Sequence, residues 1–173
     1  KNRTGKLMKE LNRETALITG GASGIGLSTG KRLAEAGMNV VLADVEVPVL
    51  NEAVAELGEL GYKAMGIHCD VSDMASMEEM KNQIEKEFGN PKVVCLNAGV
   101  GFGSSISEAT IRDWEWVVGV NLWGVVNGLC TFLPDIKKMG EGHIVMTSSI
   151  AGHVSVPNLG PYSATKFAVV SIA

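Results

Sequence analysis

The hydrophobic positions of this chain alternate between short runs rich in β-branched residues and longer stretches with the spacing of a helix. Short runs such as residues 40–43 and 93–96 are apolar at successive positions, so both faces of these strands must be covered. The pattern predicts strands at residues 15–19, 39–43, 64–68, 92–96 and 143–147. It predicts helices near residues 25–36, 48–60, 74–88, 110–138 and 161–173.

The alternation of strands and helices continues along the chain without a Pro/Gly/Ser-rich linker or an internal repeat. We therefore predict an α/β fold, a doubly wound (Rossmann) parallel sheet of five strands with helices on both faces, in one domain over residues 1–173. Sheets of this kind bind ligands beyond the carboxyl ends of their strands. The last helix is still apolar at Ala173, so we expect the domain to need more chain than this.

Composition narrows the class of protein. The chain is 46% hydrophobic and 20% charged, which excludes disorder because collapse can offset the chain entropy. The 15 basic residues are scattered among 19 acidic ones, which argues against a nucleic-acid partner. Cys69, Cys95 and Cys130 form no CxxC pair, so we expect neither disulfides nor a metal site, and we place the protein in the cytoplasm. The charged residues 1–6 predict no secretory signal.

One stretch imitates a membrane span. Residues 116–134 carry no charge, and Gly124 and Gly128 have the spacing of a helix-packing motif. Asn121 and Asn127 would make a helix that faces lipid costly. The stretch therefore predicts a buried helix of a sheet protein and no membrane partner.

A glycine-rich turn follows the first predicted strand and leads directly into a helix. Glycines let the backbone approach a pyrophosphate closely, and the free N–H groups at a helix start face such an anion. The spacing is not the usual G-x-G-x-x-G, so a purely structural turn stays an alternative. The predicted cofactor-binding residues of this turn are Gly20, Ala22, Ser23, Gly24, Ile25 and Gly26.

Polar or small residues also end the next three predicted strands. These candidate cofactor-binding residues are Asp44, Asp70, Val71, Asn97, Ala98 and Gly99. The Asp44 carboxylate can accept hydrogen bonds from an adenosine ribose, and it would repel a 2'-phosphate, which favours NAD over NADP. The alternatives are plain: Asp44 as a helix cap, Ser72 or Asp73 as the cap of the following helix, and Gly99 as a turn residue.

Tyr162 and Lys166 are four residues apart in the last predicted helix, so their side chains project from one helical face. An ammonium group beside a phenol favours the phenolate form, which suits proton transfer. In other proteins a Tyr and a Lys four residues apart on a helix usually lie on the surface and have no catalytic role. Ser149 ends the fifth predicted strand and could hydrogen-bond a substrate oxygen, although Ser148 competes for this role and either could be a turn cap.

Together these motifs resemble the short-chain dehydrogenase/reductase family, in its compact branch. The resemblance covers nearly the whole chain in the family's order, and the motifs are jointly specific. The matching residues are 19–26, Asp70, Asn97, Ala98, Gly99, Asn121, Ser149, Tyr162 and Lys166.

The resemblance implies a nicotinamide-dependent oxidoreductase acting on a small alcohol or carbonyl compound. It implies Tyr162 as general acid/base and Ser149 as the group that orients the substrate oxygen. By the same resemblance Lys166 would bind the nicotinamide ribose and favour the Tyr162 phenolate, and Asn121 would hold a water in a proton relay. Without the family, Asn121 is a polar residue that breaks a long helix.

Two further expectations come with the resemblance. The family pairs its helices across a two-fold axis, so we expect a homodimer or homotetramer in which Gly124 and Gly128 allow close approach of a second copy. The family also continues into further strands and a substrate lid that are lacking after Ala173, which leaves the fifth strand at an open sheet edge.

The alternative to the oxidoreductase is a catalytically silent dinucleotide-binding or regulatory protein.

Overall fold

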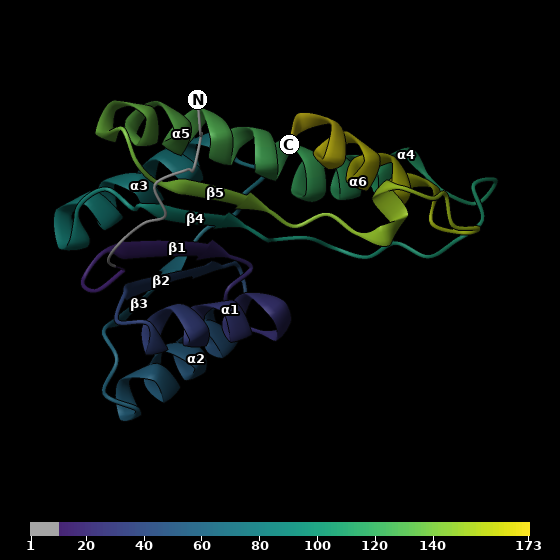
Figure 1. Ribbon diagram of the computed structural model, residues 1–173. Coiled ribbons are helices and arrows are strands. Elements are labelled where there is room, and N and C mark those ends of the chain that lie inside the picture. The colour runs from purple at the N-terminus through teal and green to yellow at the C-terminus, as the bar shows by residue number, and fades with distance from the viewer. Residues whose placement is uncertain (1–10) are drawn as a thin grey trace.

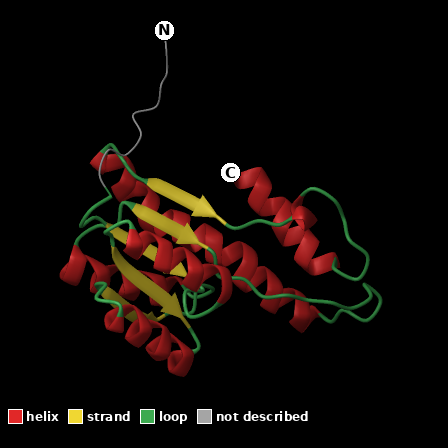
Figure 2. Ribbon diagram, turned by 60° about the horizontal axis from the view of Figure 1, so that its bottom comes forward, coloured by secondary structure: helices red, strands yellow, loops and turns green. Residues whose placement is uncertain are grey.

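Five parallel strands organise the fold in a computed structural model that describes residues 11–173 (Figure 1). They are β1 (Thr15–Thr19), β2 (Asn39–Asp44), β3 (Ala64–His68), β4 (Val93–Leu96) and β5 (His143–Met146). Their order in the sheet is β3-β2-β1-β4-β5, and every neighbouring pair is parallel. The direction of winding therefore reverses between β1 and β4, which is where such sheets bind ligands. Figure 2 shows the strands pointing the same way, so that their carboxyl ends lie together along one edge of the sheet.

Helices cover both faces, so the predicted doubly wound α/β fold is confirmed. The helices α1 (Gly24–Glu35) and α2 (Val47–Glu59) lie on one face of the sheet (Figure 1). On the other side lie α3 (Met74–Phe88), α4 (Ile111–Val118), α5 (Gly124–Met139) and α6 (Gly160–Ile172). A π-helical turn, η1 (Gly119–Trp123), joins α4 to α5, and a short 3₁₀ turn, η2 (Ile150–Gly152), follows β5. The predicted absence of a secretory signal concerns residues 1–6, which lie outside the described residues.

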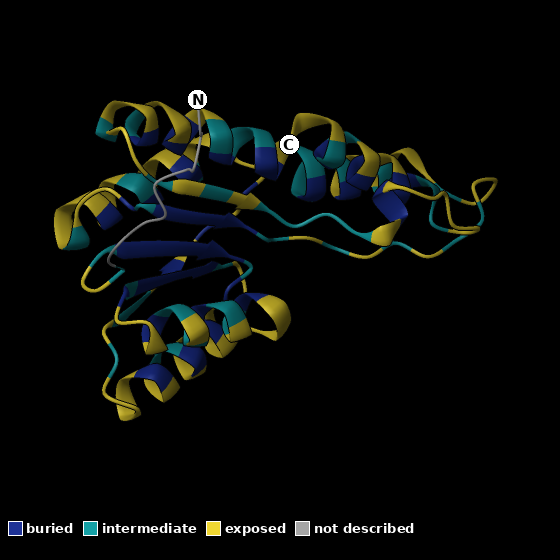
Figure 3. Ribbon diagram, in the orientation of Figure 1, coloured by how far each residue is buried: buried dark blue, intermediate teal, exposed yellow. Residues whose placement is uncertain are grey.

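The sheet separates two hydrophobic clusters, which explains the strands that are apolar at successive positions. Leu17 packs with Phe132 on the α3 and α5 side, and the next residue, Ile18, packs with Leu57 on the α1 and α2 side. All four side chains are buried, and Figure 3 shows β1 and β4 as buried strands. Of the two strands at the edges of this sheet, β3 and β5, β5 carries an exposed valine: Val145 is 50% exposed.

The apolar run from α4 to α5 packs one face against other elements of this chain, which favours the predicted helix of a sheet protein over a membrane span. The run Ile111–Met139 is long and apolar enough to cross a membrane, with a mean hydropathy of 1.5. Its inner face is nevertheless packed against α3 and β4, and Asn127 Nδ2 donates to the Val71 carbonyl at 2.9 Å.

Gly124 and Gly128 allow α5 to approach the sheet closely. A Cβ at Gly124 would lie 2.6 Å from Val71 Cγ2, and one at Gly128 would lie 2.3 Å from Leu96 Cδ2. The prediction that these glycines face a second copy is therefore wrong, because they bring α5 close to the sheet of its own chain.

Candidate active site

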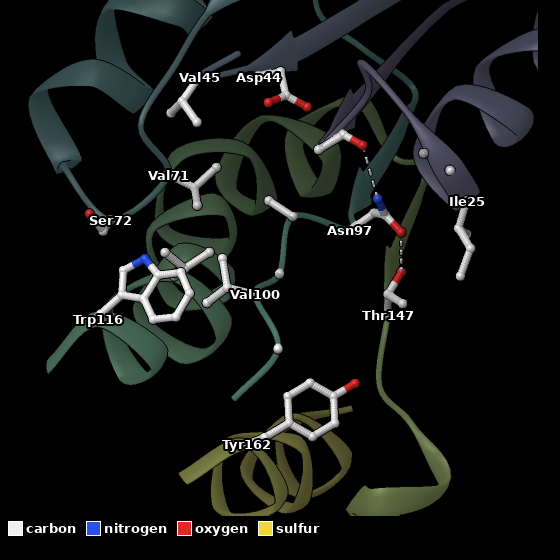
Figure 4. A pocket seen from close by; sticks show the side chains of 18 of the residues that line it. Ile25, Asp44, Val45, Val71, Ser72, Asn97, Val100, Trp116, Thr147 and Tyr162 are labelled. Carbon is white, nitrogen blue, oxygen red and sulfur yellow. Dashed lines mark hydrogen bonds between the residues drawn. The ribbon is translucent and has the colours of Figure 1, made fainter. Parts of the chain in front are cut away.

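A pocket of about 960 Å³ opens at the carboxyl edge of the sheet, between the loops that follow the strands and the start of α6 (Figure 4). It gathers most of the residues that the sequence predicted for the site. These are Gly20, Ser23, Gly24, Ile25, Gly26, Asp44, Asp70, Val71, Asn97, Ala98, Gly99, Ser149, Tyr162 and Lys166. The two predicted residues outside its lining, Ala22 and Asn121, are both buried beside it.

The glycine turn after β1 is built for close backbone contact. Gly20 has a φ of +63°, and a Cβ there would lie 2.8 Å from Ala98 Cα. A Cβ at Gly26 would lie 2.0 Å from the Gly20 carbonyl oxygen, so only glycine fits. Around Gly24, in contrast, a Cβ would meet nothing within 4 Å, which leaves room for a ligand against the backbone. Ser23, the N-cap of α1, makes no side-chain capping bond, so the first N–H groups of α1 are available to an anion.

Asp44 stands at the end of β2 with its carboxylate held in place. Its Oδ2 accepts from the Ala22 N–H at 3.0 Å, and its Oδ1 accepts from the Glu46 N–H at 3.2 Å. Ala22 therefore contributes by fixing Asp44. Glu46 is itself the N-cap of α2, so Asp44 is not the cap of that helix. The remaining lone pairs of its carboxylate are available to a ligand in the pocket.

The residues that follow β3 have different partners and different surroundings. Asp70 Oδ1 accepts from both the backbone N–H and the hydroxyl of Ser72, at 2.9 and 2.7 Å. Asp73 caps α3 by accepting from the Ala75 N–H at 3.0 Å, which is the alternative role the sequence left open for it. Val71 is buried beneath the pocket against α5.

Asn97 ties three strand ends together. Its Nδ2 donates to the carbonyls of Thr19 and Gly20 at 3.1 and 3.3 Å, and its Oδ1 accepts from Thr147 Oγ1 at 3.1 Å (Figure 4). The Thr19 hydroxyl accepts in turn from the backbone N–H groups of Asn97 and Ala98. This network fixes the glycine turn relative to β4 and β5. Thr147 was missed from the sequence, since a threonine at the end of a strand carries no distinguishing signal.

Asn121 lies in the π-helical turn and is fully buried. Its Oδ1 accepts from the Val100 N–H at 2.7 Å, and its Nδ2 donates to the Val100 carbonyl at 2.9 Å and to Thr165 Oγ1 at 3.4 Å. The amide thus pairs with the backbone of Val100 much as a neighbouring strand would. Single π-helical turns inside α-helices are frequent at functional sites. Here the turn positions the loop after β4, while the water-relay role of Asn121 stays a prediction.

Lys166 reaches back from α6 toward the end of β5. Its Nζ donates to the Thr147 carbonyl at 2.8 Å and lies 5.6 Å from the centre of the Tyr162 ring. The residue is only 4% exposed, and burial lowers the pKa of its ammonium group from the ordinary value of 10.5.

The two serines after β5 have different surroundings. Ser148 Oγ donates to the Lys166 carbonyl at 2.9 Å, so its proton is already used within the fold. Ser149 Oγ accepts from the Ala151 N–H at 3.2 Å as the N-cap of η2. Its own proton is left available to an acceptor in the pocket. The turn-cap role considered for Ser149 is thus present, and it leaves the hydroxyl able to donate.

Comparison with known proteins is consistent with this geometry. Residues 14–173 match the family model described as short chain dehydrogenase, and the chain belongs to that family. A "C alpha-dehydrogenase" from Sphingobium sp. is 40% identical over 167 residues, covering 95% of this chain and 55% of that protein. A diacetyl reductase, (S)-acetoin forming, from Staphylococcus epidermidis is 38% identical over 159 residues, covering 91% of this chain and 62% of that protein.

Solved structures share the fold closely. A short chain dehydrogenase/reductase from Burkholderia phymatum, solved in complex with NAD, has a TM-score of 0.93 and 39% sequence identity. The match covers 95% of this chain and 59% of that one. This chain therefore spans roughly half to two thirds of the relatives it matches.

Proposed function

We propose that this protein is an NAD-dependent oxidoreductase that transfers a hydride between a nicotinamide cofactor and an alcohol or carbonyl substrate. The observation that carries the proposal is the layout of one pocket. Its glycine turn and Asp44 lie at one end, and Ser149, Tyr162 and Lys166 lie at the other. The dehydrogenase and reductase names of the relatives and the NAD bound to the Burkholderia protein support the same class of reaction.

The residues present fit a dinucleotide. The open space at Gly24 and the free N–H groups at the start of α1 suit a pyrophosphate. The held carboxylate of Asp44 suits the two hydroxyls of an adenosine ribose and would repel a 2'-phosphate. Lys166, at the opposite end, is the only Lys or Arg among the described lining residues. NAD is therefore preferred to NADP.

The proposed proton donor and acceptor is Tyr162. The cofactor, when bound, would supply a hydride from its reduced form, NADH, or accept one in its oxidised form, NAD⁺. Tyr162 supplies, through Oη, the proton that the substrate oxygen gains on reduction, and it takes this proton back on oxidation. Ser149 would donate a hydrogen bond from its hydroxyl to the same oxygen, without transferring its proton, and so fix the orientation of the substrate. The ammonium of Lys166, 5.6 Å from the centre of the Tyr162 ring, would favour the Tyr162 phenolate, and it would also hold the nicotinamide ribose.

The alternative is a silent protein that binds a dinucleotide without turnover. Such a protein needs the glycine turn and Asp44 but not the three residues at the other end. The burial of Lys166 favours the enzyme, because taking an ammonium group out of water is costly and the fold alone gives it one carbonyl partner among the described residues.

We also propose that the protein assembles as a homodimer or a tetramer of dimers in the cytoplasm. Trp123 of η1 is 54% exposed, and Phe167 of the neighbouring α6 is 40% exposed. Large apolar side chains on adjacent helices are typical of a surface that a partner covers. The free cysteines Cys69, Cys95 and Cys130 are in keeping with a reducing compartment.

Deuterium transfer tests the proposed reaction. The protein is incubated with NADH that carries deuterium at C4 of the nicotinamide and with a panel of ketones and aldehydes. We expect at least one alcohol product with deuterium on its carbinol carbon, detected by mass spectrometry. Binding of NADH without deuterium transfer to any carbonyl compound contradicts the proposal and favours the silent alternative.

A further inference from the structure

We infer that Thr147 is a positioning residue of the proposed active site: its hydroxyl holds its own carbonyl in place, and that carbonyl holds the ammonium group of Lys166. The inference rests on the proposed function and adds to that site a residue that takes no part in the chemistry. The link through Thr147 fixes Lys166 relative to the glycine turn before a cofactor binds.

Thr147 follows directly after β5 and is fastened to the end of β4 by two hydrogen bonds. Its backbone N–H donates to the Leu96 carbonyl at 3.1 Å, and its Oγ1 donates to Asn97 Oδ1 at 3.1 Å (Figure 4). The first bond continues the pairing of the two strands by one residue. The second bond holds the side chain as well as the main chain, so the Thr147 carbonyl has little freedom to turn.

The amide of Asn97 decides which way the Thr147 hydroxyl donates. Asn97 Nδ2 is the donor to the carbonyls of Thr19 and Gly20, at 3.1 and 3.3 Å, so Oδ1 is the atom that accepts. A serine at position 147 could donate the same bond, whereas a valine has the shape of threonine but nothing to donate. The Thr147 side chain therefore connects the glycine turn after β1 with the end of β5.

Lys166 is held both at its main chain and at the tip of its side chain. Its carbonyl accepts from Ser148 Oγ at 2.9 Å, and its Nζ donates to the Thr147 carbonyl at 2.8 Å. Gly152 packs against the first of these bonds, since a Cβ there would lie 2.6 Å from both the Lys166 carbonyl oxygen and Ser148 Oγ. The main chain of Lys166 is thus fixed, and the Thr147 carbonyl limits the freedom of its long, flexible side chain.

The position of the Lys166 ammonium matters because two other parts of the site adjoin it. Nζ lies 5.6 Å from the centre of the Tyr162 ring, and a Cβ at Gly99 would lie 3.6 Å from Nζ. Burial lowers the pKa of the ammonium, and an acceptor held at the right place stabilises its charged form against this effect. An ammonium that is held in advance also loses less freedom when a cofactor binds, which strengthens binding.

Exchange of the Lys166 ammonium protons with water, followed by heteronuclear NMR of the cofactor-free protein, tests the inference. The Lys166→Met variant identifies the signal, and the exposed Lys137 gives a reference. We expect the Lys166 protons to exchange more slowly than those of Lys137, because they are buried and hydrogen-bonded. We expect Thr147→Val to speed this exchange about fivefold, the factor that corresponds to one ordinary hydrogen bond, and Thr147→Ser to restore most of the slow exchange.

Thr15→Val is the matched control. Thr15 is a buried threonine at the amino end of β1, and its Oγ1 donates to the Phe88 carbonyl at 3.0 Å. Thr15→Val and Thr147→Val each remove one threonine hydroxyl bond, so both should lower the free energy of unfolding in urea by similar amounts. Exchange at Lys166 and the affinity for NADH should stay unchanged in Thr15→Val, whereas Thr147→Val should also weaken NADH binding about fivefold.

The outcomes separate this inference from the proposed function. Exchange at Lys166 as fast as at Lys137 in the unmodified protein overturns the inference without any variant. Unchanged exchange in Thr147→Val, fast exchange in Thr147→Ser, or faster exchange in Thr15→Val overturns it as well. Faster exchange in Thr147→Val with an unchanged affinity for NADH overturns the effect on the cofactor. An unmodified protein that does not bind NADH overturns the proposed function, while the exchange rates still decide whether Thr147 holds Lys166.

Discussion

Replacement of Asn121 measures how much the π-helical turn depends on one amide. Asn121→Leu keeps the volume of the side chain but removes its bonds to Val100 and Thr165. Thr165 Oγ1 keeps its bond to the Tyr162 carbonyl, so two groups are left unpaired, the N–H and the C=O of Val100. Val100 is half-buried and lines the open pocket, so at about 0.5–1.5 kcal/mol for each lost hydrogen bond we expect the free energy of unfolding to fall by about 1–3 kcal/mol.

Asn127 provides the matched control. It lies on the same apolar helical run, and its Nδ2 donates only to the Val71 carbonyl in the described structure. Asn127→Leu should therefore cost about 0.5–1.5 kcal/mol, half the loss at Asn121. Urea unfolding followed by circular dichroism gives both values. If Asn121→Leu costs no more than Asn127→Leu, then the amide does not hold the loop after β4 as described.

Three other changes test separate parts of the account. Asp44→Ala should weaken NAD about tenfold or more while bringing NADP closer to parity in competitive titration, and tighter binding of NADP by the unmodified protein overturns the assignment. Because burial lowers the pKa of Lys166, the unfolded chain binds more protons below 10.5, so the free energy of unfolding should rise with pH in that range. Lys166→Met should reduce this rise, as measured by urea unfolding at several pH values. An identical slope of the free energy of unfolding against pH in both proteins would contradict the lowered pKa of Lys166. Trp123→Lys should halve the mass seen by sedimentation at low micromolar concentration, whereas Leu60→Lys, on α2's C-terminal cap, should not; a mass unaffected by Trp123→Lys refutes this interface.

The fold could be predicted because its signal is local. Strands buried on both faces are apolar at successive positions, and their observed bounds differ from the predicted ones by one residue at most, as where β2 extends to Asp44. The helix over residues 110–138 was also predicted as one run. Its π-helical turn was not. The turn contains Asn121, whose amide bonds the backbone of Val100, 21 residues away, and the hydrophobic pattern carries no signal of such a contact.

The lining of the pocket was predictable at the ends of strands, as with Asp44 and Asn97. Side chains that act through tertiary contacts were not found. Phe102 and Leu159, for example, line the pocket from irregular loops that are distant in sequence, and the bridge between Ser104 and Leu159 joins these loops. Gly124 was assigned to a second copy because helix periodicity shows which residues share a face and not what that face meets.

The most direct test of the proposed chemistry is the exchange of Tyr162 for phenylalanine, which removes the phenolic hydroxyl and with it the transferable proton. Turnover with NADH and a ketone substrate, and NADH affinity by titration, are measured in the same preparation of Tyr162→Phe. We predict that kcat falls by about 10²-fold or more while the Kd for NADH stays within about twofold of the unmodified protein. An unchanged kcat would contradict the assignment of Tyr162 as the acid and base of the reaction.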